Sequence, residues 1–574
     1  DVINPIFFNI GSGDEECVDD DAAVAPFDCA TAVANFGCDM AWGGSTIGEL
    51  CPVSCDTCPE ECADDDSLVA PFTCATAVAS FGCDFIWGGI TIGEACPETC
   101  GLCDDSVDFE CNDPVCLNID NVDAEVIDIK NKALSPGFID MHAHDDIAMF
   151  VYPDMDFKLM QGVTTNVNGN CGSGVIPHSS ADIINWHPNF DGIPEWSSYG
   201  EYLELVDKSK TSIHSAFLVG HGPIRKATTG NEKRMPTQSE FDVMKAWIKE
   251  GMEEGAVGFS TGLIYEPGRY SNTEELIELA KVISSYNGVY FSHMRNEAGH
   301  LIRSIEETIR IGEEAGCSIE ISHHKVSGQE NWGKSVESLN SIEEARSRGL
   351  NVHSDQYPYN AGSTSLFAVV QNNAFNEKSV DGGMGSQTGD KILIAGSAKD
   401  PSLVGKTLGD LCDEYDLPEQ EAAEKLLKID SGIFVVTEGM VEDDVARILA
   451  HPTTMIGSDG VPLPGNPHPR LYGCFPRVLG KYSREEGVIS MQEAIHKMTG
   501  QSAEKVNLND RGFIRPGLNA DIVIFDEDTI IDKATYEKPR VYPEGIIHIF
   551  VNGELAVKDG KQTDLRAGKV ARRS

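Results

Sequence analysis

Between residues 134 and 459 the chain alternates eight times between a short apolar segment and a longer segment with helical spacing of apolar residues. The predicted strands are residues 134–144, 164–170, 214–221, 256–263, 288–294, 318–325, 351–357 and 453–459. Segments between them, such as 239–255 and 302–316, place apolar residues three and four positions apart, as amphipathic helices do. Eight such alternations predict an α/β protein built on a TIM-like (β/α)8 barrel.

Polar and ionisable side chains stand where these predicted strands end. They are His142 and His144, Asn170 with Cys171, His221, His293, His323 with His324, Asp355, and Asp459. Barrel active sites lie at the carboxyl ends of the strands, so we expect these side chains to converge. A single buried histidine is usually a satisfied core residue, and this is our interpretation of His221 and His353. Metal-type side chains at the same end of five strands indicate a site instead.

The candidate site has the composition of a zinc centre. His142 and His144 are two residues apart on a strand, so both imidazoles face the same way. Cys171 is the only cysteine at a predicted strand end, and a zinc-bound thiolate is deprotonated and can bridge two ions. The candidate ligands are His142, His144, Cys171, His293, His323 and Asp459. This mixed nitrogen, sulfur and oxygen set suits two adjacent zinc ions better than other metals.

Such a centre predicts hydrolysis. Zinc lowers the pKa of bound water toward neutrality and polarises a carbonyl oxygen. A nearby carboxylate can take the proton from that water and pass it to a leaving nitrogen, and Asp459 suits this catalytic role.

Several long motifs carry a family resemblance over residues 126–574. In order, they are PGFIDMHAHDD, GVTTNVNGNCGSG, EGAVGFSTGLIYEPG, SHMRNE, ISHHKV, IGSDG and HPRLYGCFPRVLGKY. They closely resemble the D-aminoacylases of the amidohydrolase superfamily. The resemblance implies hydrolysis of N-acyl-D-amino acids to a carboxylate and a free D-amino acid, by a barrel flanked by a small β-sandwich.

The resemblance also implies roles for individual residues. The six candidate ligands would bind metal, with Cys171 bridging and Asp459 as the general acid/base. One zinc, held by Cys171, His293 and His323, would be tight and a second weak, with His324 as an alternative ligand to His323. The residues implied to hold the substrate are Lys325, Tyr357, Ser363 and Arg470. For Arg470 the chemistry agrees, because a guanidinium can grip an α-carboxylate with two parallel hydrogen bonds.

The barrel domain is expected over residues 134–509 and contains a long segment, 366–450, between the last two strands. We expect a lid, an extra helical subdomain or a tolerated insertion there. Residues 510–574 read as short strands of the β-sandwich, which a linker at 104–133 would help to complete, with residues 1–16 as a further candidate part. The N-terminal strands that normally start the sandwich in this family are not recognisable.

Two cysteine-rich modules, residues 17–58 and 62–103, occupy that region instead. Each holds six cysteines, and the second set is the first shifted by 45 positions: Cys17, Cys29, Cys38, Cys51, Cys55 and Cys58, then Cys62, Cys74, Cys83, Cys96, Cys100 and Cys103. Zinc knuckles are the rival interpretation, but neither module contains a histidine. Disulfide bonds in an oxidising compartment are favoured, since domains this small need covalent staples. The closing patterns CPVSCDTC and CPETCGLC resemble ShK toxin-like modules, which implies three bridges in each.

The net charge of the chain and its distribution exclude some classes of binding partner. The net charge is −48, and residues 1–129 contain no Lys or Arg, which argues against nucleic acid or an anionic membrane surface. No apolar run approaches the roughly 20 residues that cross a bilayer. The cysteine modules indicate a secreted or extracytoplasmic protein, whose targeting segment is not in the chain given, and the family resemblance implies a small N-acylated amino acid as its substrate. The cysteine modules would be free to bind a protein or glycan partner.

Two rival functions remain at this point. A cyclic amidase of the dihydropyrimidinase or hydantoinase type shares the barrel and the paired histidines, but bridges its metals with a carboxylated lysine ending strand four. The segment AVGFSTGL here contains no lysine. A secreted adhesion protein with an inactive barrel is the second rival, although such a barrel should have lost at least one ligand.

Overall fold

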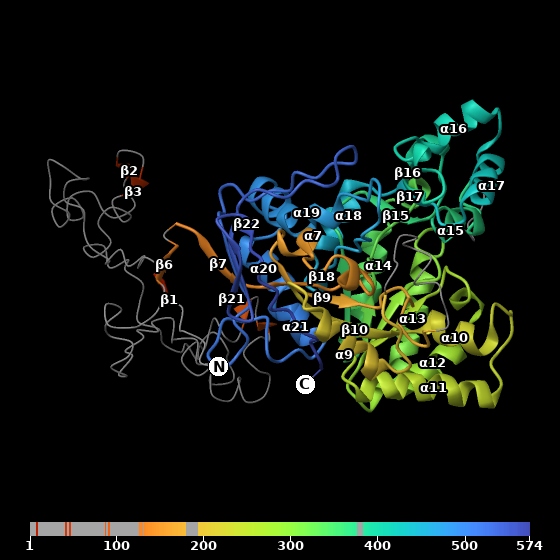
Figure 1. Cartoon of the computed structure of the whole chain (residues 1–574), viewed down its shortest axis with the longest axis horizontal. Helices are drawn as coiled ribbons and strands as arrows, with labels where there is room; N and C mark the ends of the chain where they lie inside the picture. Colours follow the sequence, from red (N-terminus) through yellow and green to blue (C-terminus); the bar gives the residue numbers. More distant parts are fainter. Residues whose placement is uncertain are drawn as a thin grey trace. The chain divides into compact units, whose positions relative to one another are not determined.

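The computed structural model describes residues 7–9, 41–42, 45–46, 86–87, 90–91, 126–129, 131–178, 193–375 and 383–573. The chain divides into two compact units, Asp1–Lys130 and Asn131–Ser574 (Figure 1). No helix in the described part of the chain is long and apolar enough to span a membrane.

The first unit is described only at short strands. β1 (Phe7–Asn9) pairs in parallel with β6 (Val126–Asp128). Two antiparallel ladders follow one pattern in the two cysteine modules: β2 (Ala41–Trp42) with β3 (Ser45–Thr46), and β4 (Ile86–Trp87) with β5 (Ile90–Thr91). Ala41 and Ile86 are 45 positions apart, the same shift as between the two cysteine sets. The twelve module cysteines and their predicted bridges lie outside the described residues.

The second unit contains the predicted barrel, and all eight strands are confirmed. They are β8 (Phe138–Asp140), β9 (Val163–Asn168), β10 (His214–Gly220), β11 (Gly258–Gly262), β12 (Val289–His293), β13 (Ser318–Ile321), β14 (Val352–Gln356) and β18 (Thr454–Ile456). They pair in parallel in chain order from β8 to β18. The first and last strands meet through the hydrogen bond from Met141 N to Ile456 O, 3.1 Å, and a bridge between Ala143 and Gly460.

Helices surround these strands (Figure 1). Those of the barrel and its loops are α6 (Ala148–Val151), α7 (Asp156–Leu159), α9 (Tyr199–Ser209), α10 (His221–Thr229), α11 (Gln238–Glu253), α12 (Thr273–Ser284), α13 (Leu301–Ala315), α14 (Ser335–Ser347), α18 (Glu442–Ala450), α19 (Arg470–Arg477), the π-helix η6 (Val478–Glu485), α20 (Met491–Met498) and α21 (Gly500–Lys505). Successive side chains of a strand point to opposite faces, so each barrel strand contributes to two apolar clusters, one inside the barrel and one under the helices. On β10, Leu218 packs in a cluster with Val167 of the neighbouring strand, whereas Phe217 belongs to the cluster that contains Ile248 of α11.

The first predicted strand, 134–144, is in fact two strands in different sheets. β7 (Ala133–Pro136) pairs with β19 (Ile522–Phe525), and β8 belongs to the barrel. The break falls at Gly137, where an added Cβ would lie 2.1 Å from the Thr164 Oγ1 atom. Only glycine allows this close passage between the two sheets, so one apolar run serves both.

The segment after β14 builds a small α/β subdomain rather than a purely helical one. Its elements are β15 (Ala361–Ser365), α15 (Leu366–Gln371), β16 (Ile392–Gly396), α16 (Leu408–Tyr415), α17 (Glu419–Ile429) and β17 (Phe434–Glu438). The antiparallel strand order is β15-β17-β16, and the helices pack in a separate apolar cluster that includes Leu366, Leu408 and Leu426. The subdomain therefore begins at residue 361, and the following helix, α18, precedes the last barrel strand.

The carboxyl-terminal residues form a second sheet. Its five strands are arranged in the order β22-β21-β20-β19-β7. Besides β7 and β19 they are β20 (Ile546–Val551), β21 (Glu554–Lys558) and β22 (Lys561–Gln562). The strands expected beyond residue 510 are therefore present, and residues just before the barrel complete their sheet.

Candidate metal centre

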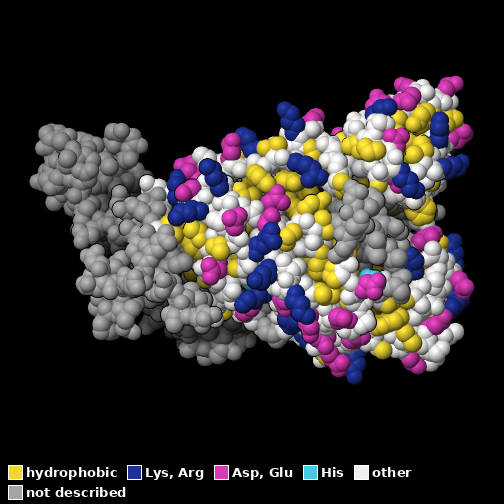
Figure 2. Space-filling view, in the orientation of Figure 1, with side chains coloured by type: hydrophobic (Ala, Val, Ile, Leu, Met, Phe, Trp, Pro, Cys, Tyr) yellow, Lys and Arg dark blue, Asp and Glu magenta, His cyan; other side chains and the backbone are white. Residues whose placement is uncertain are grey.

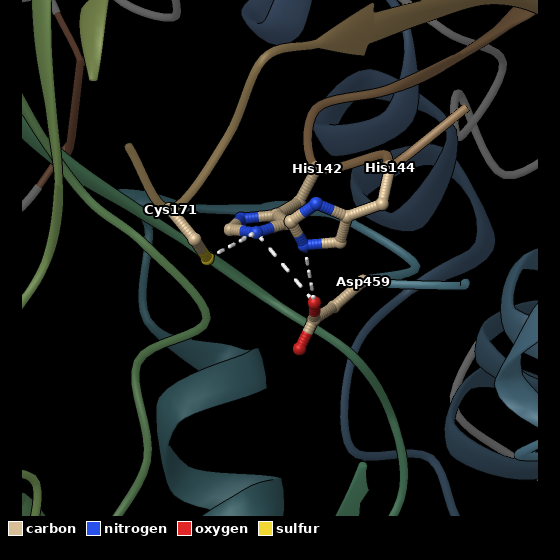
Figure 3. A group of neighbouring side chains, drawn as sticks. All are labelled: His142, His144, Cys171 and Asp459. Atoms are coloured by element: carbon tan, nitrogen blue, oxygen red, sulfur yellow. Dashed lines mark hydrogen bonds and ion pairs between the residues drawn. The ribbon is translucent and has the colours of Figure 1, made fainter. Parts of the chain in front are cut away.

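Two groups of potential metal ligands meet at the carboxyl ends of the barrel strands. One contains His142, His144, Cys171 and Asp459, and the other contains Cys171, His293 and His323. Within each group the ligand atoms lie within 4.8 Å of one another. Figure 3 shows the first group, with Cys171 and the Asp459 carboxylate on either side of the two imidazoles. The structure thus brings together all six predicted ligands, from five strands.

Cys171 belongs to both groups, and its Sγ is the ligand atom that they share. Its Sγ lies 3.3 Å from the Nε2 of His142, 3.3 Å from the Nδ1 of His293 and 3.3 Å from the Nε2 of His323. The ring nitrogens of His293 and His323 approach each other to 2.7 Å. A thiolate sulfur can accept hydrogen bonds from imidazoles, but three ring nitrogens converging on one sulfur is also the arrangement expected of the ligands of bound metal ions. The donor set fits zinc, which these residues would hold.

Three of these ligands have unusual backbone conformations. The φ angles are 54° at Cys171, 37° at His323 and 48° at Asp459, all in the left-handed region. Residues other than glycine adopt this region at a cost and concentrate at functional sites. At each of these three positions the side chain reaches the shared centre from a left-handed residue just beyond its strand.

The electrostatics favour a thiolate at Cys171. Burial alone would raise the pKa of this thiol, but the imidazoles of His142, His323 and His293 bring it well below its usual value. Burial raises the thiol pKa at the other free cysteines of the described chain, Cys317, Cys412 and Cys474. Cys171 is therefore the described thiol suited to bind a metal.

Two carboxylates orient the histidines from behind. Asp355 Oδ1 lies 3.1 Å from the Nδ1 of His142 and accepts a hydrogen bond of 2.9 Å from the backbone N of His323. Glu297 Oε1 lies 3.0 Å from the Nδ1 of His323 and 2.6 Å from the Nζ of Lys325. Such partners fix the tautomer and orientation of ligating histidines. Sequence reasoning placed Asp355 at a strand end but missed Glu297, whose signal was its place in the SHMRNE motif.

Other histidines point elsewhere. The Nε2 of His324 lies 2.9 Å from the Ser338 hydroxyl on α14, and burial lowers its pKa to about 3. His323, not His324, therefore faces the cluster. His221 is buried, with Nε2 3.1 Å from Glu275, but its Nδ1 has no hydrogen-bond partner among the described residues, so only half of the ring is satisfied as expected. His353 lies 3.3 Å from the Nζ of Lys505 and contacts no candidate ligand in the described chain.

Asp459 contacts both a candidate metal ligand, His144, and the guanidinium of Arg470. Its Oδ1 lies 3.0 Å from the Nε2 of His144, and its Oδ2 lies 2.9 Å from the Nη1 of Arg470. Burial opposes ionisation, but Arg470 and His144 hold the pKa of Asp459 well below its usual value. The carboxylate is therefore charged and able to accept a proton.

A cavity of about 1030 Å³ opens above these ligands. Lys325, Tyr357 and Ser363, three of the four residues that the family resemblance implies for substrate binding, line this cavity. Arg470 is fully buried and stacks 4.4 Å from the Tyr357 ring centre, with its Nη2 3.4 Å from the Ser363 carbonyl oxygen. The four predicted substrate residues thus form one cluster beside Asp459, and none is an isolated surface charge.

The α/β subdomain supplies one wall of the same cavity. Phe367, Met384 and Phe434 line it, and Tyr265 lines it from the β11 loop. The Tyr265 hydroxyl lies 3.1 Å from the Thr364 hydroxyl, and its ring centre lies 4.8 Å from that of His293. Sequence reasoning did not select Tyr265, although the motif GLIYEPG contains it. The subdomain belongs to the site and is not an incidental insertion.

Known proteins are similar to this chain in sequence over most of its length. A sequence profile of the amidohydrolase family matches residues 125–364 and 430–561, and so omits the middle of the subdomain. D-aminoacylase of Alcaligenes xylosoxydans xylosoxydans is 38% identical over 459 residues, which cover 78% of this chain and 89% of the relative. N-acyl-D-glutamate deacylase of the same organism is 35% identical, covering 78% and 88%.

Solved structures agree with these matches. A D-aminoacylase with a binuclear metal center has a TM-score of 0.71 at 37% identity, covering 79% of this chain and 93% of that chain. N-acyl-D-glutamate deacylase from Bordetella bronchiseptica, complexed with zinc and a phosphonate inhibitor that mimics the tetrahedral intermediate, also has a TM-score of 0.71. It is 35% identical and covers 79% and 92%.

Proposed function

The chain belongs to the amidohydrolase family, and from this premise we propose that it hydrolyses N-acyl-D-amino acids to a carboxylate and a free D-amino acid. The observation that carries the proposal is the cluster of six metal-type ligands around Cys171, beside a cavity with a cationic end. Relatives that span most of the chain act on this substrate class: a D-aminoacylase and deacylases of N-acyl-D-glutamate and N-acyl-D-aspartate.

The residues divide the chemistry between them. The residues that would hold zinc are His142, His144, Cys171, His293, His323 and Asp459, and the metal would supply a Lewis acid for water activation and for polarising the scissile carbonyl. Asp459 takes the proton from the attacking water and delivers it to the leaving nitrogen, which departs as the amine. Asp355 and Glu297 hold His142 and His323 in fixed orientations throughout.

The cationic end of the cavity binds the substrate carboxylate. Lys325 and Arg470 flank the Tyr357 ring, with the Lys325 Nζ 5.8 Å from its centre. The Tyr357 side chain is buried beside Arg470 and lines the cavity, where a ligand can reach it. Lys325 lines the cavity and Arg470 lies directly behind Tyr357, so this end of the cavity suits an α-carboxylate, which would fix the amide carbonyl near Asp459.

The rival functions fit less well. A carboxylated lysine cannot bridge metals here, because β11 reads Gly-Phe-Ser-Thr-Gly and the Cys171 sulfur holds the shared position. An inactive barrel would not keep six converging ligands, two orienting carboxylates and three strained backbones. Acidic and basic side chains are interspersed over the described part of the face in Figure 2, so that face shows no uniformly basic surface for nucleic acid.

The direct test combines a zinc count with a substrate screen. We expect between one and two zinc ions per chain, and release of D-amino acids from N-acetyl-D-methionine, N-acetyl-D-leucine or N-acetyl-D-glutamate but not from their L-enantiomers. Hydrolysis of dihydrouracil without turnover of any N-acyl-D-amino acid would contradict the proposal.

We also propose that the protein acts outside the cytoplasm, with the cysteine modules as ShK-like, disulfide-bonded units that bind a protein or glycan. The twelve cysteines at matched spacing and the absence of Lys and Arg from residues 1–129 support this. Mass spectrometry after alkylation without reduction should show the twelve module cysteines unmodified. Alkylation of all twelve in the secreted protein would refute the bridges.

A further inference from the structure

A lysine below the metal centre has no role in the chemistry described above. Lys158 lies on α7, and its side chain is fully buried. Its Nζ donates to the Asp140 Oδ2 at 2.6 Å and to the Ser458 hydroxyl at 2.6 Å, and it lies 3.4 Å from the Asp145 Oδ2. An ammonium has three donors, so these three partners use its full capacity.

The first two partners lie at the seam where the barrel closes. Asp140 is the last residue of β8, and its Oδ1 accepts from the backbone N of His142 at 3.2 Å and of Ser458 at 2.7 Å. Ser458 also donates its hydroxyl to Asp140, at 2.6 Å. The next residue, Asp459, then bonds through its backbone N to the His142 carbonyl at 2.7 Å. The Lys158 ammonium therefore joins the segment that carries His142 to the segment that carries Asp459.

The third partner extends the connection to the neighbouring strand. The Asp145 Oδ2 accepts from the Asn166 side chain at 2.8 Å, and its backbone N donates to the Asn168 side chain at 3.0 Å. Asn166 and Asn168 lie on β9, which leads directly to Cys171. One buried cation thus links the three segments that supply the ligand group of Figure 3.

We propose that Lys158 is a positioning residue for the metal centre: its ammonium holds the ends of β8, β9 and β18 in the register that brings His142, His144, Cys171 and Asp459 together. This proposal rests on the proposed metal-dependent function. Lys158 touches no candidate ligand atom and does not line the cavity, so its effect passes through the backbone. The strained conformations of Cys171 and Asp459 require such external support.

The test replaces Lys158 with Met, which keeps the length of the side chain and removes its donors. Lys497→Met is the matched control, because Lys497 is equally buried and donates to the Thr454 carbonyl oxygen at the opposite end of β18. The cobalt-substituted proteins should be compared by visible absorption, and the zinc proteins by chelator competition and by kcat and KM. We expect Lys158→Met to change the cobalt spectrum, weaken zinc about 10–100-fold and lower kcat by a similar factor, with KM nearly constant.

The control variant should keep the parent spectrum and kcat even if its melting temperature falls. The proposal is overturned if Lys158→Met retains the parent cobalt spectrum and zinc affinity, or if both variants lose them in parallel. If Lys158→Met does not fold, Ser458→Ala removes only one link of the same network and must change the spectrum in the same direction. The spectrum needs no substrate, so a failure of the proposed substrate class leaves this test intact.

Discussion

Replacing Asp459 with Asn separates proton transfer from metal binding, because the amide keeps the shape of the carboxylate and one potential ligand oxygen. In the structure Oδ1 faces the Nε2 of His144 at 3.0 Å and Oδ2 faces Arg470 at 2.9 Å. The variant retains an oxygen for the metal but cannot accept a proton. We therefore expect a large loss of kcat with zinc still bound.

The expected loss of kcat in Asp459→Asn follows from the role of Asp459 as general acid and base. General acid–base catalysis contributes about 10²–10⁴-fold in rate, which corresponds to roughly 3–5 kcal/mol of barrier. The variant should also be less stable, because the buried Arg470 guanidinium loses its carboxylate. Removing one partner of a buried ion pair costs about 3–5 kcal/mol. Activity must therefore be measured well below the melting temperature of the variant.

The assay follows release of the primary amine from N-acetyl-D-methionine by a fluorogenic amine reagent, with zinc content measured on the same sample. Asp532→Asn is the control. Asp532 pairs at 3.1 Å with Arg477, which lies on α19 as Arg470 does, but Asp532 does not line the cavity. It should lower stability and leave kcat nearly unchanged. A zinc-loaded Asp459→Asn enzyme with kcat within about tenfold of the parent would refute the role of Asp459 as proton carrier.

Three further predictions address the ligands, their orientation and pH. Cys171→Ala should lower zinc content, measured by plasma mass spectrometry, and abolish turnover, because both ligand groups share its sulfur; retention of both ions would exclude the bridge. Glu297→Gln should weaken zinc about 10–100-fold in chelator competition, because His323 and Lys325 lose a common partner, and an unchanged affinity would count against this role. Burial, with Lys505, Arg346 and Lys497 nearby, lowers the pKa of His353 from 6.5 to about 2. The unfolded chain therefore binds a proton below about pH 6.5 that the folded chain does not, and stability should fall by roughly 1–2 kcal/mol on reaching pH 5. His353→Gln should remove that share of the slope in urea unfolding, and equal slopes in the two proteins would disprove it.

The barrel could be predicted because each of its strands is marked by a short sequence pattern of its own. Each strand is an apolar run that a polar residue ends, and each lies within a few residues of its predicted range. The α/β subdomain was not, because β15 pairs with β17 and β17 with β16, although β15 and β17 are separated by the residues from 366 to 433. No local pattern reports such distant antiparallel pairing. The division of one apolar run between β7 and β8 depended on a single glycine contact, which sequence periodicity does not register.

In the metal centre, too, some residues could be predicted from the sequence and others could not. Residue types at strand ends identified the six ligands because barrel geometry converts strand ends into neighbours. Their orientation depends instead on groups that resemble ordinary polar residues in the sequence: Asp355, Glu297 and Lys158. Asp355 could be placed at a strand end and Glu297 lies in a recognised motif, but their orienting role becomes visible only with their partners from distant segments, and Lys158 has no sequence signal at all.

Backbone conformation sets a further limit on prediction. Cys171, His323 and Asp459 adopt left-handed φ angles, which are uncommon for residues other than glycine although Asp and His tolerate them better than most, and residue type alone does not predict them here. The strain persists because neighbouring groups hold it: Asp459 bonds through its backbone N to the His142 carbonyl, and the His323 backbone N bonds to Asp355. The ligand geometry is therefore a property of the closed barrel seam and its buried polar network. A sequence can name the ligands, but only these tertiary contacts explain why their atoms converge.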